Sequence, residues 1–139
     1  MRWHPLIPAL ASLAFLAVPA LAERPPQKRE AAAVVVVGTV EKIQSADKPF
    51  GGDGTMTTYT AEIKVEKVEK GDKVKAGETI KITWFHVTKR PTQPIVGAFG
   101  QAHDVKEKGK IRVWLMPPPR GTEAYPVIYN KDGVEKADK

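Results

Sequence analysis

The chain has 139 residues, a formal net charge of +6 and no cysteine. This length fits one domain, and the lack of cysteine excludes disulfides, thiolate metal ligands and a cysteine nucleophile. The positive surplus is modest and lysines alternate with glutamates, which is typical of a solvated surface and argues against nucleic acid as a partner. We therefore expect one domain whose core holds together without covalent staples.

The first 22 residues have the three-part layout of a secretory signal peptide. Arg2 supplies positive charge, residues 6–18 form an apolar run, and small residues precede Glu23 at the positions that a signal peptidase reads. The apolar run is shorter than the roughly 20 residues that a membrane-spanning helix needs. We expect cleavage after Ala22, no transmembrane segment in the remainder, and a secreted or periplasmic protein. Cleavage would leave 117 of the 139 residues. The net charge of this remainder is +5, because Arg2 is the one charged residue that cleavage removes.

The remainder divides into three predicted parts. Residues 23–30 are charged and rich in proline, and we expect a flexible leader. Residues 31–134 contain the apolar patterns and are predicted to form a single β domain. Residues 135–139 are a charged tail that we expect to fray.

Two strands are predicted in the first half of the domain. Residues 33–43 include four consecutive valines, which are β-branched and disfavour helix. Gly38 inside this strand indicates a bulge or a close approach of two backbones. Residues 48–54 are a glycine-rich loop, and residues 57–68 alternate polar and apolar side chains as a strand does. The alternation slips by one residue before Val68, which predicts a β-bulge.

Three strands are predicted in the second half. Residues 79–87 and 110–116 alternate clearly, and the last strand, residues 124–129, is an edge strand because it contains Pro126. The long segment at residues 88–109 is of a kind that is usually functional or mobile. Five bulged strands predict an all-β fold, a small five-stranded Greek-key barrel of the OB type, with a β-sandwich as the alternative.

The order of these pieces resembles the netrin-like OB-fold domain of the tissue inhibitors of metalloproteinases, and that of small secreted bacterial proteins with the same layout. The resemblance covers roughly residues 33–87 and implies a barrel whose outer face and loops bind a partner. It does not extend to the inhibitory mechanism, because those inhibitors use an N-terminal cysteine and this chain has none. The residues that carry it are 32–40, 59–65, 68–72 and 80–85.

The best candidate binding surface lies on the strands at residues 79–87 and 110–116. Alternation places aromatic and basic side chains on the face opposite the apolar one. Such side chains are frequent binding anchors, and OB folds bind ligands on such a face. Alternatively, residues 88–109 fold over this face and make it a second small core. If the two strands pair, the surface contains Lys81, Phe85, Arg112, Trp114 and Met116.

Other chemistry has weaker support in the sequence. His86 and His103 offer an alternative metal site, but their spacing matches no ligand motif. Ser45 is the one serine after the predicted cleavage site, and no Gly-x-Ser-x-Gly frame surrounds it. We therefore expect no enzyme, no cofactor and no metal.

The sequence thus predicts a non-enzymatic, extracytoplasmic binding or interaction module. Its partner is a protein, a glycan or a small ligand, and the sequence does not decide among them. A metal-handling periplasmic protein and a purely structural component of the cell envelope are the alternatives.

Overall fold

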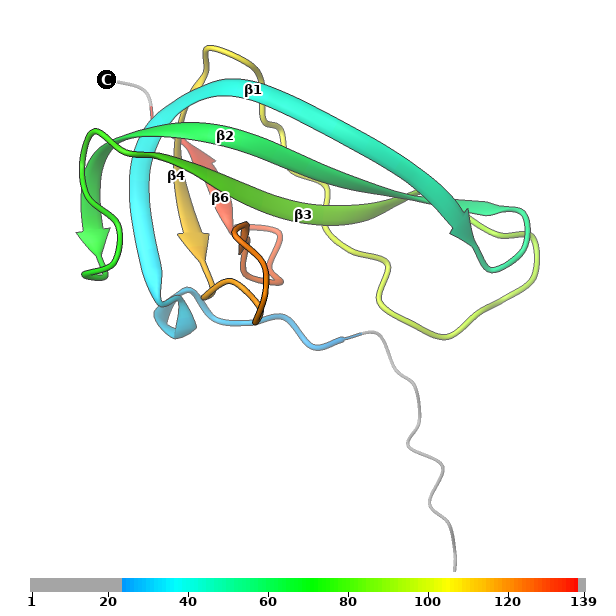
Figure 1. Cartoon of the computed structure of the whole chain (residues 1–139). Coiled ribbons are helices and arrows are strands. Elements are labelled where there is room, and N and C mark those ends of the chain that lie inside the picture. The colour runs from blue at the N-terminus through cyan, green and yellow to red at the C-terminus, as the bar shows by residue number, and fades with distance from the viewer. Residues whose placement is uncertain (1–23, 138–139) are drawn as a thin grey trace, which may run out of the picture.

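The computed structural model describes residues 24–137, so the predicted signal peptide lies outside the described residues. All strands of this part belong to one mixed sheet (Figure 1). The all-β class is therefore confirmed. No helix within these residues is long and apolar enough to cross a membrane. The elements are η1 (Arg29–Ala31), β1 (Val34–Phe50), β2 (Gly54–Lys70), β3 (Thr79–Lys89), β4 (Lys110–Leu115), β5 (Tyr125–Pro126) and β6 (Val134–Lys136).

The strands follow the order β5-β3-β2-β1-β4-β6. β1, β2 and β3 form an antiparallel meander, and β4 returns to pair with β1, which is the Greek-key arrangement. β5 is parallel to β3 and covers only part of the predicted strand at 124–129, whereas β6 was not predicted. The sheet is not closed through its strands, so the barrel stays a prediction.

Residues 126–128 connect β3 and β4, which lie on opposite sides of β2 and β1 in the sheet. The Val127 N–H donates to the Thr83 carbonyl on β3 at 2.9 Å, and the Ile128 N–H donates to the Trp114 carbonyl on β4 at 3.0 Å. One short segment thus satisfies backbone groups of both β3 and β4. The sheet is consequently curved around its apolar face, as Figure 1 shows.

The far ends of β1, β2 and β3 extend beyond the rest of the sheet (Figure 1). β4 pairs with β1 only from Val34 to Thr39, whereas β2 pairs with β1 as far as Phe50. The predicted loop at 48–54 is therefore shorter than expected, because β1 continues through Pro49. Proline is tolerated there since β4 does not reach this part of β1, so no ladder bond is lost on that side.

Two predicted irregularities in the meander are confirmed. Gly38 pairs with Val65 and Val37 pairs with Lys67, so Glu66 is the extra residue of a bulge on β2. A Cβ on Gly38 would meet the backbone carbonyl of the next β2 residue, Lys64. The glycine is required because two backbones approach closely at this point.

The main core lies on the inner face of β1–β4, with Val127 closing one side. It contains both apolar faces that alternation predicts, because every one of these side chains is buried: Ile80, Ile82 and Trp84 on β3, and Ile111, Val113 and Leu115 on β4. A smaller cluster on the other face consists of Ala32, Val35 and Ile128, with Trp114 and Met116 packed against it.

Both terminal segments of the described chain contact the sheet. The Gln27 N–H donates to the Tyr129 carbonyl at 2.7 Å, and the Gln27 side-chain oxygen accepts from the Tyr129 N–H at 2.8 Å. Glu135 belongs to β6 and pairs with Arg112 on β4. Composition predicts a flexible leader and a frayed tail, whereas the polar residues described within 24–30 and 135–137 have specific backbone and side-chain partners.

Candidate functional site

The predicted binding surface is divided among three places in the fold. Its premise, that the strands at 79–87 and 110–116 pair, is wrong, because β2 and β1 lie between β3 and β4. Lys81 is exposed and lies 3.9 Å from the carboxylate of Glu123. Arg112 and Trp114 belong to a polar cluster near the chain ends, whereas Phe85 and Met116 line a cleft.

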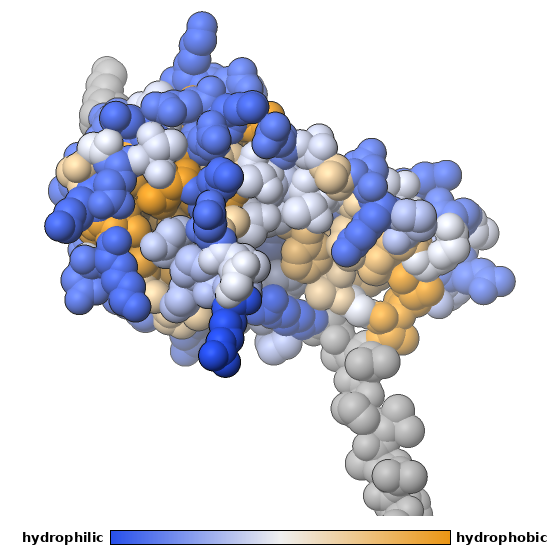
Figure 2. All heavy atoms as spheres, in the orientation of Figure 1, coloured by the Kyte–Doolittle hydropathy of each residue, from blue (hydrophilic) through white to orange (hydrophobic). Residues whose placement is uncertain are grey.

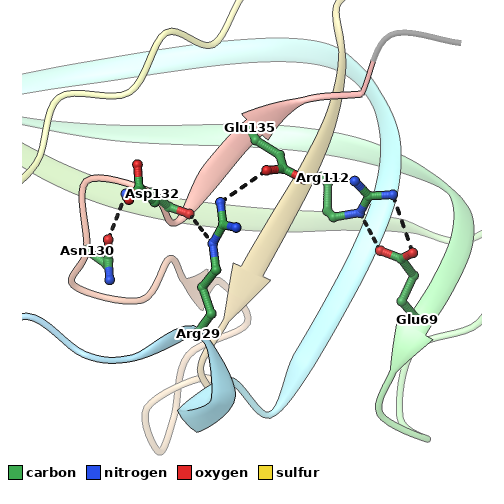
Figure 3. Close-up of polar contacts among 6 residues, drawn as sticks. All are labelled: Arg29, Glu69, Arg112, Asn130, Asp132 and Glu135. Atoms are coloured by element: carbon green, nitrogen blue, oxygen red, sulfur yellow. Dashed lines mark hydrogen bonds and ion pairs between the residues drawn. The ribbon is translucent and has the colours of Figure 1, made fainter.

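Arg112 is held by two carboxylates (Figure 3). Its Nε donates to Glu69 Oε1 at 2.5 Å, and its Nη1 donates to Glu135 Oε1 at 2.8 Å. These hydrogen bonds hold the pKa of both glutamates below the usual range. Arg112 therefore connects β4 to β2 and β6, and its guanidinium is already occupied.

Trp114 is covered by the segment that precedes β1. The Arg29 guanidinium lies over the indole ring at 3.7 Å from its centre. Arg29 is fixed in turn by the Asp132 carbonyl at 2.9 Å and by Glu135 Oε2 at 3.1 Å (Figure 3). Trp114 therefore belongs to a second small core, as the alternative in the sequence analysis proposed. The segment that covers it is residues 29–32 and not residues 88–109.

A cleft of about 730 Å³ lies beside the far ends of β2 and β3. It is lined by residues of β1–β3, by residues 98–103 and by residues 126–129. Apolar spheres gather along the lower side of the extension in Figure 2, bordered by hydrophilic residues. The volume of the cleft and its mixed polar and apolar lining match those of small-molecule sites. Its aromatic and sulfur-containing side chains are Phe50, Met56, Trp84, Phe85, Met116 and Tyr129.

The 88–109 segment forms one wall of the cleft. The Val87 N–H donates to the Phe99 carbonyl at 2.8 Å, and the Gln101 N–H donates to the Phe85 carbonyl at 2.9 Å. The Tyr129 hydroxyl accepts from the Gly100 N–H at 3.0 Å, and its ring centre lies 6.0 Å from that of Phe85. The long segment is thus anchored along the edge of β3 by its second half.

The charges at the cleft have one sign. Arg24 and Lys48 line it, and no aspartate or glutamate does so among residues 24–137. The Arg24 guanidinium lies 5.0 Å from the centre of the Tyr129 ring.

His103 contributes the one buried polar side-chain atom that lacks a hydrogen-bond partner in the part of the chain that the structure describes, its Nε2. Its ring meets Trp84 edge-on at 6.0 Å between centres. Burial, assisted by the nearby charge of His86, lowers the His103 pKa to about 4. The imidazole is therefore neutral at pH 7.

The two histidines of the alternative metal site are thus near neighbours. A structural zinc site needs four ligands. Within residues 24–137, no group of three or more histidine, cysteine, aspartate or glutamate side chains is placed to hold a metal ion. His103 contributes an uncharged side chain to the lining of the cleft.

Sequence reasoning assigned two of the cleft residues, Phe85 and Met116, to a binding surface and one, His103, to an alternative metal site, and it missed most of the others. Phe50 and Met56 flank a turn that composition extended into a longer loop. Arg24 lies in the leader, where charge and proline indicate disorder. The useful signal was the long 88–109 segment itself, since loops of this length are often functional.

Comparison with protein-family models, with curated proteins and with solved structures gives no match for this chain. The function must therefore be argued from the cleft and its chemistry.

Proposed function

We propose that this chain is a non-enzymatic, extracytoplasmic binding module whose ligand occupies the cleft beside β2 and β3. The observation that carries the proposal is the concentration of aromatic and methionine side chains around one hollow of about 730 Å³. A cavity lined in this way gains free energy when an apolar ligand displaces its water. The secretory layout of the first 22 residues supports the extracytoplasmic location.

The Greek-key order of β1–β4 supports the resemblance to netrin-like OB domains. OB folds are partly open Greek-key barrels that bind ligands on one strand face and in the adjoining loops. Here the cleft combines the outer part of the meander with the segments at 98–103 and 126–129. A binding role placed at strands and loops together is consistent with that family.

The proposal is tested with N-phenyl-1-naphthylamine, a neutral apolar dye whose fluorescence rises when it leaves water. The purified protein should bind the dye saturably, and Phe85→Gln or Met116→Gln should weaken binding by about tenfold, because each removes apolar contact worth about 1.4 kcal/mol or more. Val96→Gln is the matched control, since Val96 is an exposed apolar residue of the 88–109 segment and does not line the cleft.

Near-ultraviolet circular dichroism establishes that each variant is folded before it is compared. If the dye does not bind the folded protein, or if all three variants weaken it equally, the cleft is not a ligand site.

A further inference from the structure

The two cations that line the cleft, Arg24 and Lys48, have no carboxylate partner within residues 24–137. Their surroundings differ from those of Lys110 and Arg112, which are paired with glutamates. The charged side chains that line the cleft are both cations, which attract an anion. A ligand with negative charge would complement this lining, whereas a cationic ligand would be repelled.

The cleft is continuous with a second, more polar hollow. A second hollow of about 490 Å³ adjoins the cleft and shares Arg24 and Gln101 with it. It is more polar, and it is lined by the prolines at 25–26, by Asn130 and by one residue of each charge, Lys131 and Asp132. An apolar space therefore leads into a polar one past an arginine. This sequence of environments suits a molecule with an apolar body and a polar head.

From these observations we propose that the cleft binds an acyl carboxylate, an amphiphile with one linear apolar chain and one anionic head. This inference rests on the proposed function, because it assigns the ligand class of the same cleft. The chain would lie against the aromatic and methionine side chains, and the carboxylate would be held by Arg24 or Lys48.

The experiment displaces N-phenyl-1-naphthylamine from the purified protein with three ligands of equal chain length. Dodecanoate and dodecyltrimethylammonium are used below the concentration at which they form micelles, and dodecan-1-ol is used below its solubility limit. Dodecanoate should displace the dye at a concentration about tenfold lower than the alcohol, the effect of one partly desolvated ion pair. The cationic amphiphile should be the weakest of the three.

The double variant Arg24→Gln/Lys48→Gln removes both cations that line the cleft. It should abolish the preference for dodecanoate over dodecan-1-ol, which is the ratio of the two displacing concentrations measured on the same protein. The control is Lys73→Gln/Lys75→Gln, which removes the same charge from exposed positions in the turn before β3 and should keep the preference.

The outcomes separate the two proposals. If the protein does not bind the dye, the proposed function fails. If the dye binds but the carboxylate and the alcohol displace it equally, or if the double variant keeps the preference, the cleft is a binding site and the assignment of an acyl carboxylate is overturned.

Discussion

Arg112 shows how one side chain can satisfy a binding pattern in the sequence and a structural role in the fold. Alternation correctly places it on the face opposite Ile111 and Val113, near Trp114. What alternation cannot predict is the position of Glu69 and Glu135, which come from β2 and β6 and occupy the guanidinium. The position of the half-buried Arg112 side chain depends on these two carboxylates, which are distant from it in sequence.

We expect Arg112→Met to lower the free energy of unfolding by about 1 kcal/mol at pH 7, a value that allows for solvent screening of these partly exposed pairs. The folded state lowers the pKa of Glu69 and Glu135, so the stability they contribute is present above their ordinary pKa and is lost as pH falls through the folded value. Urea unfolding at pH 7 and pH 3 should show the difference shrinking in acid.

Lys81→Met is the matched control for this prediction, because the exposed ammonium of Lys81 lies 3.9 Å from Glu123 and should contribute almost nothing. Equal losses for the two variants would contradict the structural role of Arg112.

His103 gives the protein a distinct dependence of stability on pH. Its pKa falls from 6.5 to about 4 on folding, so the unfolded chain takes up a proton between these values and the folded chain does not. The free energy of unfolding should therefore decrease as pH falls from 6.5 toward 4, by less than about 3 kcal/mol because His103 is partly exposed. Carboxylates add little above pH 5.

Urea unfolding of the protein and of His103→Gln from pH 7 to pH 5 tests this expectation. The variant should show a flatter profile, since glutamine does not titrate. An unchanged slope would show that the imidazole is not buried in the way described.

At the scale of elements, the alternation of polar and apolar residues predicted the features that depend on residues adjacent in sequence, namely strand positions and a bulge. The strands at 79–87 and 110–116 nearly coincide with β3 and β4, and the bulge opposite Gly38 was visible as a slip in alternation. The far end of β1 was missed because Pro49 and the following glycines resemble a loop. That stretch is a strand only because β2 pairs with it, which is a property of the hairpin and not of either segment.

Gly38 offers the clearest test at this scale. Gly38→Ala should destabilise the protein by about 2 kcal/mol, because the new Cβ would press on the backbone carbonyl of Lys64 and the side chain of Ile63. Gly52→Ala is the comparison, since its Cβ would meet nothing and only its positive φ of 88° opposes the change.

Thermal and urea unfolding of both variants gives the two losses. A smaller loss at Gly38 than at Gly52 would contradict the close approach of β1 and β2.

For the whole molecule, the cleft arises from an imbalance in strand length. β1, β2 and β3 extend beyond the sheet segment covered by β4, and residues from three other segments, 24–27, 98–103 and 126–129, line the cleft beside the extension (Figure 1). Strand patterns predicted the all-β class but not this arrangement, because it depends on contacts between segments that are far apart in the chain. The same reason explains why two cleft residues were assigned to a binding surface and most were missed.

The measurement that tests the central claim most directly is a nuclear magnetic resonance titration of the uniformly ¹⁵N-labelled protein with dodecanoate. We predict that the backbone amides of residues 83–86, 98–101 and 127–129 shift together and saturate with one affinity, while those of the turn at 71–78 do not move. Shifts confined to other surfaces, or no saturable shift at the cleft, would contradict the assignment of this cleft as the ligand site.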